Sequence, residues 1–241
     1  MLVCTQSVAP ILRSPDPQSE RLSDLLFGEA FAIRHEQGAW AFGAGPDGTE
    51  GCVALASLAA PSGAATHRVR RGVVQRFDEP ALTRTSGVLL PLNARVRLTG
   101  ATAAIRYPGG GPGSIVVELE SGGWVTQQGL APIDEPERDL RAVAEGLVGG
   151  AYLHGGKTWI GLDGPGFVHT VLAACGLAVP RALDAQRAFI AESKLTVGAE
   201  PVSVTHADGA CGFAFADGQA IVVSLAQMAV VRTPMDRVAD R

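Results

Sequence analysis

The feature of this chain that most limits its fold is a pattern of short strands and turns that occurs twice before residue 134. In residues 11–58, short apolar runs are separated by turn segments such as "SPDPQSE" and "GPDGTEG". After the linker-like stretch "AAPSGAATH", residues 67–134 repeat this order, and "GAWAFG" in the first segment corresponds to "GGWVTQ" in the second. Short, evenly spaced strands joined by turns indicate small β-domains. We therefore predict a duplicated β-barrel module, at residues 1–62 and 66–134.

Two helical patterns follow residue 134, where the composition changes. The segment "PERDLRAVAEGLVG" has apolar residues at helical spacing, and we expect Asp134 to cap this helix before Pro136 in its first turn. The segment "PGFVHTVLAACG" carries an apolar stripe, begins at Asp163 or Gly164 and ends at Gly176. Glycine favours the left-handed conformation that commonly ends a helix.

The remainder of the chain has the pattern of antiparallel strands. Residues 200–231 contain four short apolar runs, and tight turns are expected at Asp208-Gly209 and Asp217-Gly218. Helices that precede a run of such strands are typical of an α+β domain. We place this domain at residues 136–241.

Charge and hydropathy exclude several classes of function. The formal net charge is -4, and the charged residues are scattered, so we expect no nucleic-acid partner. The N-terminus lacks a basic segment followed by a long apolar one, and no stretch of about 18 uncharged apolar residues occurs elsewhere. We therefore expect no membrane partner and predict a cytoplasmic protein.

Neither cysteines nor histidines have the spacing of a metal site. The four cysteines lie far apart without a CxxC pair, and the five histidines are dispersed. The glycine-rich segment from Gly109 to Gly113 does not open a helix, so we interpret it as a flexible hairpin tip rather than a phosphate-binding loop. We predict neither a metal nor a cofactor.

A glycine-punctuated turn leads into the second helix, in the segment "YLHGGKTWIGLDGPGF" that begins at Tyr152. This segment resembles the NlpC-type cell-wall peptidases, whose hallmark is a "Y-x-W-G-G" turn followed by "D-C-S-G" at the start of a helix. The two preceding modules resemble the bacterial SH3-like domains that precede such peptidases. The resemblance implies two small SH3-like β-barrels followed by a papain-like NlpC-type α+β domain. It also implies cleavage of γ-D-glutamyl links in peptidoglycan stem peptides.

The residues that carry out this chemistry in the family are replaced here. A cysteine peptidase needs a thiolate at the helix N-terminus and an imidazole that accepts its proton. The resemblance places Gly164 at the position of the nucleophile, with Pro165 in place of the following serine. It places Ala210 at the position of the base and leaves only Ser224 as a polar third residue. We therefore predict a catalytically degenerate site.

Other reactive side chains do not restore the activity in this interpretation. Cys175 lies eleven positions after Gly164, which is about 16 Å along a helix axis. Cys211 should face the core if Ala210 faces the site, because neighbouring strand residues point to opposite faces. His169 lies about 140° around the helix from Gly164, so we expect a structural histidine there.

Recognition of a ligand could survive the loss of chemistry. The resemblance implies that Tyr152 and Asp163 hold the free amino group of the first L-alanine of a cell-wall peptide. The alternative is that Asp163 only caps the helix and Tyr152 belongs to the core. His154 and His206 are further ligand-binding candidates, because both are expected to border the cleft.

These observations favour a binding or regulatory module for peptidoglycan stem-peptide fragments, or for a protein partner such as an active relative. The first alternative is a cytoplasmic γ-D-glutamyl-L-diamino acid endopeptidase whose nucleophile lies elsewhere in the sequence. A second alternative is a protein-interaction scaffold that uses only the two N-terminal modules.

Overall fold

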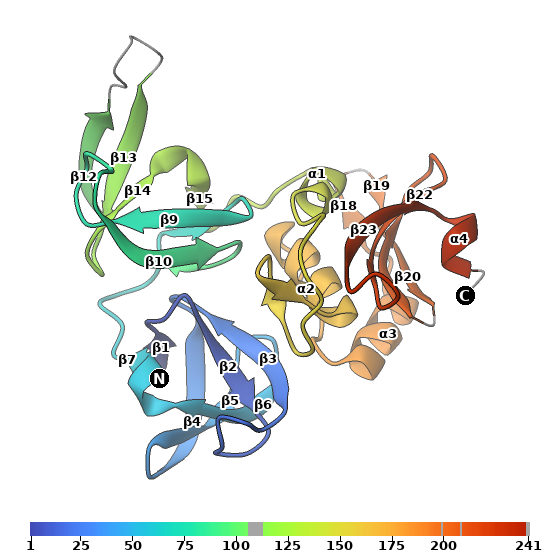
Figure 1. The fold of residues 1–241 in the computed structure, drawn as a ribbon, viewed down its shortest axis with the longest axis horizontal. Coiled ribbons are helices and arrows are strands. Elements are labelled where there is room, and N and C mark those ends of the chain that lie inside the picture. Colours follow the sequence, from blue (N-terminus) through green and yellow to red (C-terminus); the bar gives the residue numbers. More distant parts are fainter. Residues whose placement is uncertain (106–112, 199, 208, 240–241) are drawn as a thin grey trace.

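The computed structural model describes residues 1–105, 113–198, 200–207 and 209–239, and is mostly β with few helices. Figure 1 shows three groups of elements: a blue first module, a green second module, and a C-terminal part coloured yellow to red. The segment interpreted as a hairpin tip, Gly109–Gly113, lies outside the described residues except for Gly113. None of the helices in the described ranges is long and apolar enough to cross a bilayer.

The first module is one sheet with the strand order β3-β2-β6-β5-β4-β1-β7. Its core contains Ile11, Leu25 and Phe31, all of them fully buried. The elements are β1 (Leu2–Cys4), β2 (Val8–Leu12), β3 (Arg21–Leu26), β4 (Ala30–Gln37), β5 (Trp40–Ala44), β6 (Glu50–Ala54), the short helix η1 (Leu55–Ser57) and β7 (Leu58–Ala59).

The second module consists of a five-stranded sheet, β10-β9-β14-β13-β12, and a three-stranded sheet, β11-β8-β15. Leu90, Leu119 and Val125 lie in the core of this module. The elements are β8 (His67–Val69), β9 (Val73–Phe77), β10 (Thr85–Pro91), β11 (Arg95–Val96), β12 (Leu98–Ile105), β13 (Ser114–Leu119), β14 (Trp124–Thr126), the short helix η2 (Gln127–Gly129) and β15 (Leu130–Pro132).

Among the described residues, neither module closes into a hydrogen-bonded barrel, so the predicted barrels are not confirmed in that form. The register shifts within β2 and within β4, at Ile11/Leu12 and Ile33/His35. Such irregularities bend a strand and increase its twist. The bent sheet can therefore enclose an apolar core although its outer strands, β3 and β7, do not pair with each other.

The C-terminal part combines a four-stranded antiparallel sheet, β20-β21-β22-β23, with helices. Helix α2 packs against this sheet, where Phe167 meets Phe213 edge to face with ring centroids 5.6 Å apart. The elements are α1 (Leu140–Glu145), β16 (Lys157–Thr158), β17 (Gly161–Leu162), α2 (Gly164–Ala174), α3 (Leu183–Glu192), β18 (Thr196–Val197), β19 (Glu200–Pro201), β20 (Ser203–Ala207), β21 (Ala210–Ala214), β22 (Gln219–Ser224), β23 (Ala229–Pro234) and α4 (Asp236–Ala239).

The helix boundaries confirm one prediction and correct another. Helix α2 begins at Gly164 with Asp163 as its cap, and Gly176 follows it with a φ of +79°. Helix α1 is capped by Asp139, whose carboxylate accepts the backbone N–H of Ala142 at 2.9 Å, and the predicted cap at Asp134 is wrong. The residues before α1 are held by contacts outside the helix, because the backbone N–H of Glu137 donates to the carbonyl of Ala174.

Candidate functional site

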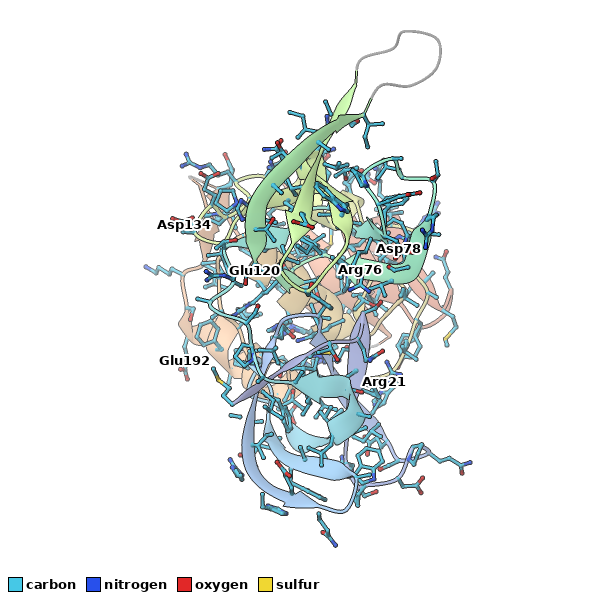
Figure 2. All side chains as sticks on the ribbon, turned by 90° about the vertical axis from the view of Figure 1, so that its left-hand side faces the viewer. Arg21, Arg76, Asp78, Glu120, Asp134 and Glu192 are labelled. Carbon is cyan, nitrogen blue, oxygen red and sulfur yellow. The ribbon has the colours of Figure 1, made fainter. Side chains whose placement is uncertain are left out.

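A cleft of about 550 Å³ lies at the N-terminus of α2. All four predicted ligand-binding residues line it, namely Tyr152, His154, Asp163 and His206. The first module contributes part of the wall through Glu20 and Arg21, at the start of β3. Figure 2 shows Arg21 at the end of the first module that adjoins the rest of the chain. The cleft is therefore built from two parts of the chain that are far apart in sequence.

The space beside Gly164, where a nucleophile's side chain would begin, is occupied by Cys211. A Cβ atom added to Gly164 would lie 2.4 Å from Cβ and 3.1 Å from Sγ of Cys211. Cys211 packs against the C-terminal core, as predicted, but it also fills the space beside Gly164, where Ala210 was expected; Ala210 still lines the cleft. Neighbouring side chains on β21 point to opposite faces, as expected. The side chain next to Gly164 is, however, that of Cys211 and not that of Ala210, which is a shift of one residue.

This shift also affects Ser224, which the resemblance gives as the polar third residue of the site. Cys211 pairs in register with Val223 on β22, whereas Ala210 pairs with Ser224. The Ser224 hydroxyl accepts the backbone N–H of Gln227 at 3.3 Å, which stabilises the turn after β22. Ser224 is thus a turn residue, and the side of the strand that faces α2 carries the apolar Val223.

The Cys211 thiol is poorly suited to act as a nucleophile. Burial, together with the nearby charge of Asp163, raises the pKa of Cys211 to about 12. His206 is its register partner on β20, but burial and the charge of Arg187 lower the pKa of that imidazole. In the described part of the chain, the His206 ring makes its contact with Gln186, where Nε2 lies 3.4 Å from Oε1.

Asp163 is engaged on both carboxylate oxygens. Its Oδ1 accepts the backbone N–H of Gly166 at 2.7 Å, so it is the cap of α2. Its Oδ2 accepts the N–H of Gly155 at 2.8 Å and pairs with Nη2 of Arg181 at 2.8 Å. A capping role is therefore confirmed, and the charge of Asp163 is already balanced within the protein.

Tyr152 and His154 enter the cleft from the turn before β16. The backbone N–H of Tyr152 donates to the carbonyl of Met228 at 2.8 Å, and its partly buried ring packs against the C-terminal core. His154 is exposed, and its Nε2 lies 3.4 Å from Oε1 of Glu20 on the first module. Tyr152 and Asp163 were expected either to bind a ligand or to have structural roles. Both have structural partners, and both also border the cleft.

Sequence reasoning missed several residues of the cleft. Glu20 and Arg21 belong to another module, and nothing in their local sequence signals a cleft more than 130 residues away. Arg181 and Arg187 lie in the segment "VPRALDAQR", to which the sequence motifs assign no role. Pairing of a carboxylate with a distant arginine has no local sequence pattern.

A buried ion cluster joins the first module to the C-terminal part. Nζ of Lys157 lies 3.2 Å from Oε2 of Glu29 and 3.2 Å from Oδ2 of Asp47, and its side chain is only 2% exposed. Its backbone N–H also donates to Asp24 at 3.0 Å. Burial opposes ionisation of Lys157, but the charges of Glu29 and Asp47 outweigh it and raise the pKa of Lys157. These contacts fix β3 beside the cleft.

The described residues contain no group of three or more histidine, cysteine, aspartate or glutamate side chains placed to hold a metal ion.

Comparison with known proteins supports the same fold. Residues 11–58 match the family described as the bacterial dipeptidyl-peptidase SH3 domain. The structure is similar to an NlpC/P60 family protein from Bacillus cereus ATCC 10987, with a TM-score of 0.73, 16% identity, and coverage of 98% of this chain and 94% of that one. This likeness shows a shared fold over nearly the whole chain.

Two more distant structures have NlpC in their names. NlpC2 from Trichomonas vaginalis is 13% identical with a TM-score of 0.42, and the alignment covers 98% of this chain and 94% of that one. NlpC1 from the same organism is 16% identical with a TM-score of 0.41, and the coverage is 98% and 89%. No curated protein sequence is detectably similar to the chain.

Proposed function

We propose that this protein is a catalytically inactive relative of the NlpC/P60 peptidases that binds peptide fragments of the cell wall in the cleft at α2. The observation that carries the proposal is the contact between Gly164 and Cys211. Gly164, at the helix N-terminus where a peptidase would present its thiolate, has no side chain. The neighbouring strand fills the space beside Gly164 with the thiol of Cys211, and it offers no imidazole at that point.

The ionisation of Cys211 supports inactivity. With its pKa raised to about 12, the thiol stays protonated at pH 7. A general base would have to remove this proton, and the lowered pKa of His206 makes that imidazole a weaker base. Val223 offers no polar atom that could orient a base on β21.

The cleft itself supports binding. Its volume of about 550 Å³ lies in the range of about 300–1,000 Å³ that is usual for small-ligand sites. Its wall presents a phenol, two imidazoles and three guanidinium groups, from Tyr152, His154, His206, Arg21, Arg181 and Arg187. Such a mixture of apolar surface and separate polar groups suits a short peptide with both charged ends.

A free amine on the peptide is proposed to lie near Tyr152 and Asp163. A substitution at Asp163 would test this poorly, because it would also remove the cap of α2 and leave the buried Arg181 without its partner. The test is therefore made on the ligand, by N-acetylation. Tyr152→Phe provides a mild protein variant, because it removes the hydroxyl and keeps the packing of the ring.

Calorimetric titration with L-alanyl-γ-D-glutamyl-diamino acid peptide tests the proposal. We expect the free peptide to bind and the N-acetylated peptide to bind about 10- to 150-fold more weakly, because a charge-assisted hydrogen bond is lost. Tyr152→Phe should weaken binding of the free peptide about 2- to 12-fold. No binding of either peptide would refute the binding role, and equal binding would refute the amine contact alone.

The γ-D-glutamyl-L-diamino acid endopeptidase remains the second candidate, for one specific reason. Cys211 and His206 are directly opposite each other in the β20–β21 register, and both border the cleft. In cross-strand pairs of this kind, the two Cβ atoms lie about 5 Å apart. If Cys211 and His206 formed a thiolate–imidazolium pair when substrate binds, the nucleophile would lie on the strand and not on the helix.

A further inference from the structure

Helix α3 forms one side of the cleft at α2 and is fixed to two neighbouring elements. Gln186 is fully buried, and its Nε2 donates to the carbonyl of Pro165 at 3.1 Å and to that of Pro180 at 2.8 Å. Pro165 lies in the first turn of α2. Figure 1 shows α3 beside β20, where the His206 ring contacts Oε1 of Gln186. A side chain on this part of α3 therefore has a defined position relative to the N-terminus of α2.

Two residues of α3 border the cleft, namely Leu183 and Arg187. They are four positions apart, so they lie on the same face of the helix. Arg187 is exposed, and its Nη2 donates to the carbonyl of His206 at 3.1 Å. A guanidinium group has five N–H donors, and among the described residues the only acceptor for those of Arg187 is this carbonyl. Arg187 therefore presents further donors to a ligand in the cleft.

The other charged arginine and carboxylate side chains of the described cleft wall already have partners of opposite charge. These pairs are Arg181 with Asp163 at 2.8 Å, Arg13 with Glu20 at 2.6 Å and Arg21 with Asp24 at 2.8 Å. Arg187 forms no such pair within the part of the chain that the structure describes. The cleft wall thus carries a guanidinium charge without a counter-ion, and a carboxylate on the ligand would supply one.

The charge of Arg187 acts on the interior of the cleft. Burial lowers the pKa of His206, and the charge of Arg187 lowers it further. Burial raises the pKa of Cys211 to about 12, and the charge of Arg187 opposes this rise. Because Cys211 fills the space beside Gly164, the charge of Arg187 extends to the N-terminus of α2. A carboxylate bound to Arg187 would therefore lie close to the peptide amine proposed to bind there.

We propose that Arg187 binds the free α-carboxylate of the D-glutamyl residue, so that the cleft selects this acid over its α-amide. The inference rests on the proposed peptide-binding function and adds a specificity-determining residue to it. A γ-glutamyl link uses the side-chain carboxyl group of the residue and leaves its α-carboxylate charged, next to the L-alanine that carries the amine. A carboxylate accepts two parallel hydrogen bonds from a guanidinium group, whereas an amide has no charge and a single acceptor oxygen.

Calorimetric titration with two ligands tests the proposal on the full chain. The first is L-alanyl-γ-D-glutamyl-diamino acid peptide, and the second is the same peptide with the α-amide, D-isoglutamine, in place of D-glutamate. We expect the acid to bind about 5- to 20-fold more tightly, because the new ion pair is partly shielded from water by the ligand. Arg187→Gln should weaken binding of the acid by the same factor and leave binding of the amide nearly unchanged.

Two further variants separate this contact from a general effect of charge or folding. Arg187→Lys keeps the charge but loses the planar fork, so it should retain part of the preference for the acid. Arg138→Gln is the matched control, because Arg138 is an exposed arginine of the C-terminal part that does not line the cleft. It should leave the binding of both peptides unchanged. Because Arg187 is exposed, its variants should unfold at the same temperature as the unmodified protein.

Three results would overturn the proposal. Equal binding of acid and amide to the unmodified protein would leave the peptide site in place but exclude a carboxylate contact. A preference for the acid that persists in full in Arg187→Gln would assign the carboxylate to another group. If neither peptide bound, the proposed peptide-binding function itself would be wrong, and the role of Arg187 would fall with it.

Discussion

At the scale of single residues, the cleft depends on Gly164 and Cys211 as a pair. Because Gly164 has no side chain, Cβ and Sγ of Cys211 can occupy the space beside it. A larger residue on the helix and the thiol on the strand exclude each other sterically. The glycine on the helix and the position of the thiol on the strand are therefore physically linked.

The steric link predicts the effect of one added methyl group. Gly164→Ala should lower the free energy of unfolding by about 1–3 kcal/mol, because the new Cβ would lie 2.4 Å from Cβ of Cys211. Gly72→Ala is the matched control, because its nearest neighbouring atom would be the carbonyl oxygen of Gly146 at 3.8 Å. Urea unfolding measures both. Equal stability of the two variants would show that Cys211 moves aside at no cost.

Sequence alone predicted the alternation of β21 but assigned its phase wrongly. Which of Ala210 and Cys211 faces α2 depends on the pairing of β21 with β20 and β22. That register is set by contacts across the sheet, and a shift of one residue reverses every side chain. A motif comparison that places the base by its glycine neighbours cannot detect such a shift.

At the scale of elements, helix ends were predictable where the signal is local. The cap of α2 at Asp163 and the glycine after the helix follow from short-range backbone geometry, and both are confirmed. The start of α1 was misplaced at Asp134, because Glu137 is held by Arg68 and Arg70 of the second module rather than by the helix. Helix α3 was not predicted, and its one fully buried residue is the polar Gln186.

The buried ion cluster between β16 and the first module carries a prediction at this scale. Lys157→Met should lower the free energy of unfolding by about 3–5 kcal/mol, because Glu29 and Asp47 would remain buried without their counter-charge. Adding Asp47→Asn to this variant should recover part of the loss. Denaturant unfolding of the single and double variants measures the effect.

An exposed ion pair provides the control for this measurement. Arg34 and Glu50 pair within the first module, with side chains that are 62% and 63% exposed. Arg34→Met should cost no more than about 1 kcal/mol, because water screens the pair. If Lys157→Met were as mild as Arg34→Met, the cluster would not hold the first module beside the cleft.

At the scale of the whole molecule, the sequence predicted the order of the parts but not how they meet. Strand and turn patterns indicated two β-modules before a region of helices and strands, and Figure 1 shows three such groups. The cleft wall from Glu20 and Arg21 depends on contacts between residues far apart in the chain. Such contacts arise from ion pairs and packing that leave no periodic signal.

We propose that this protein keeps a peptidase-like cleft without peptidase chemistry. Incubation with L-alanyl-γ-D-glutamyl-diamino acid peptide, followed by mass spectrometry, tests this proposal. We predict that the peptide is recovered intact, because Gly164 offers no nucleophile and the Cys211 thiol stays protonated. Hydrolysis that is abolished by Cys211→Ala and retained in Cys175→Ala would contradict the claim and identify the strand thiol as the nucleophile.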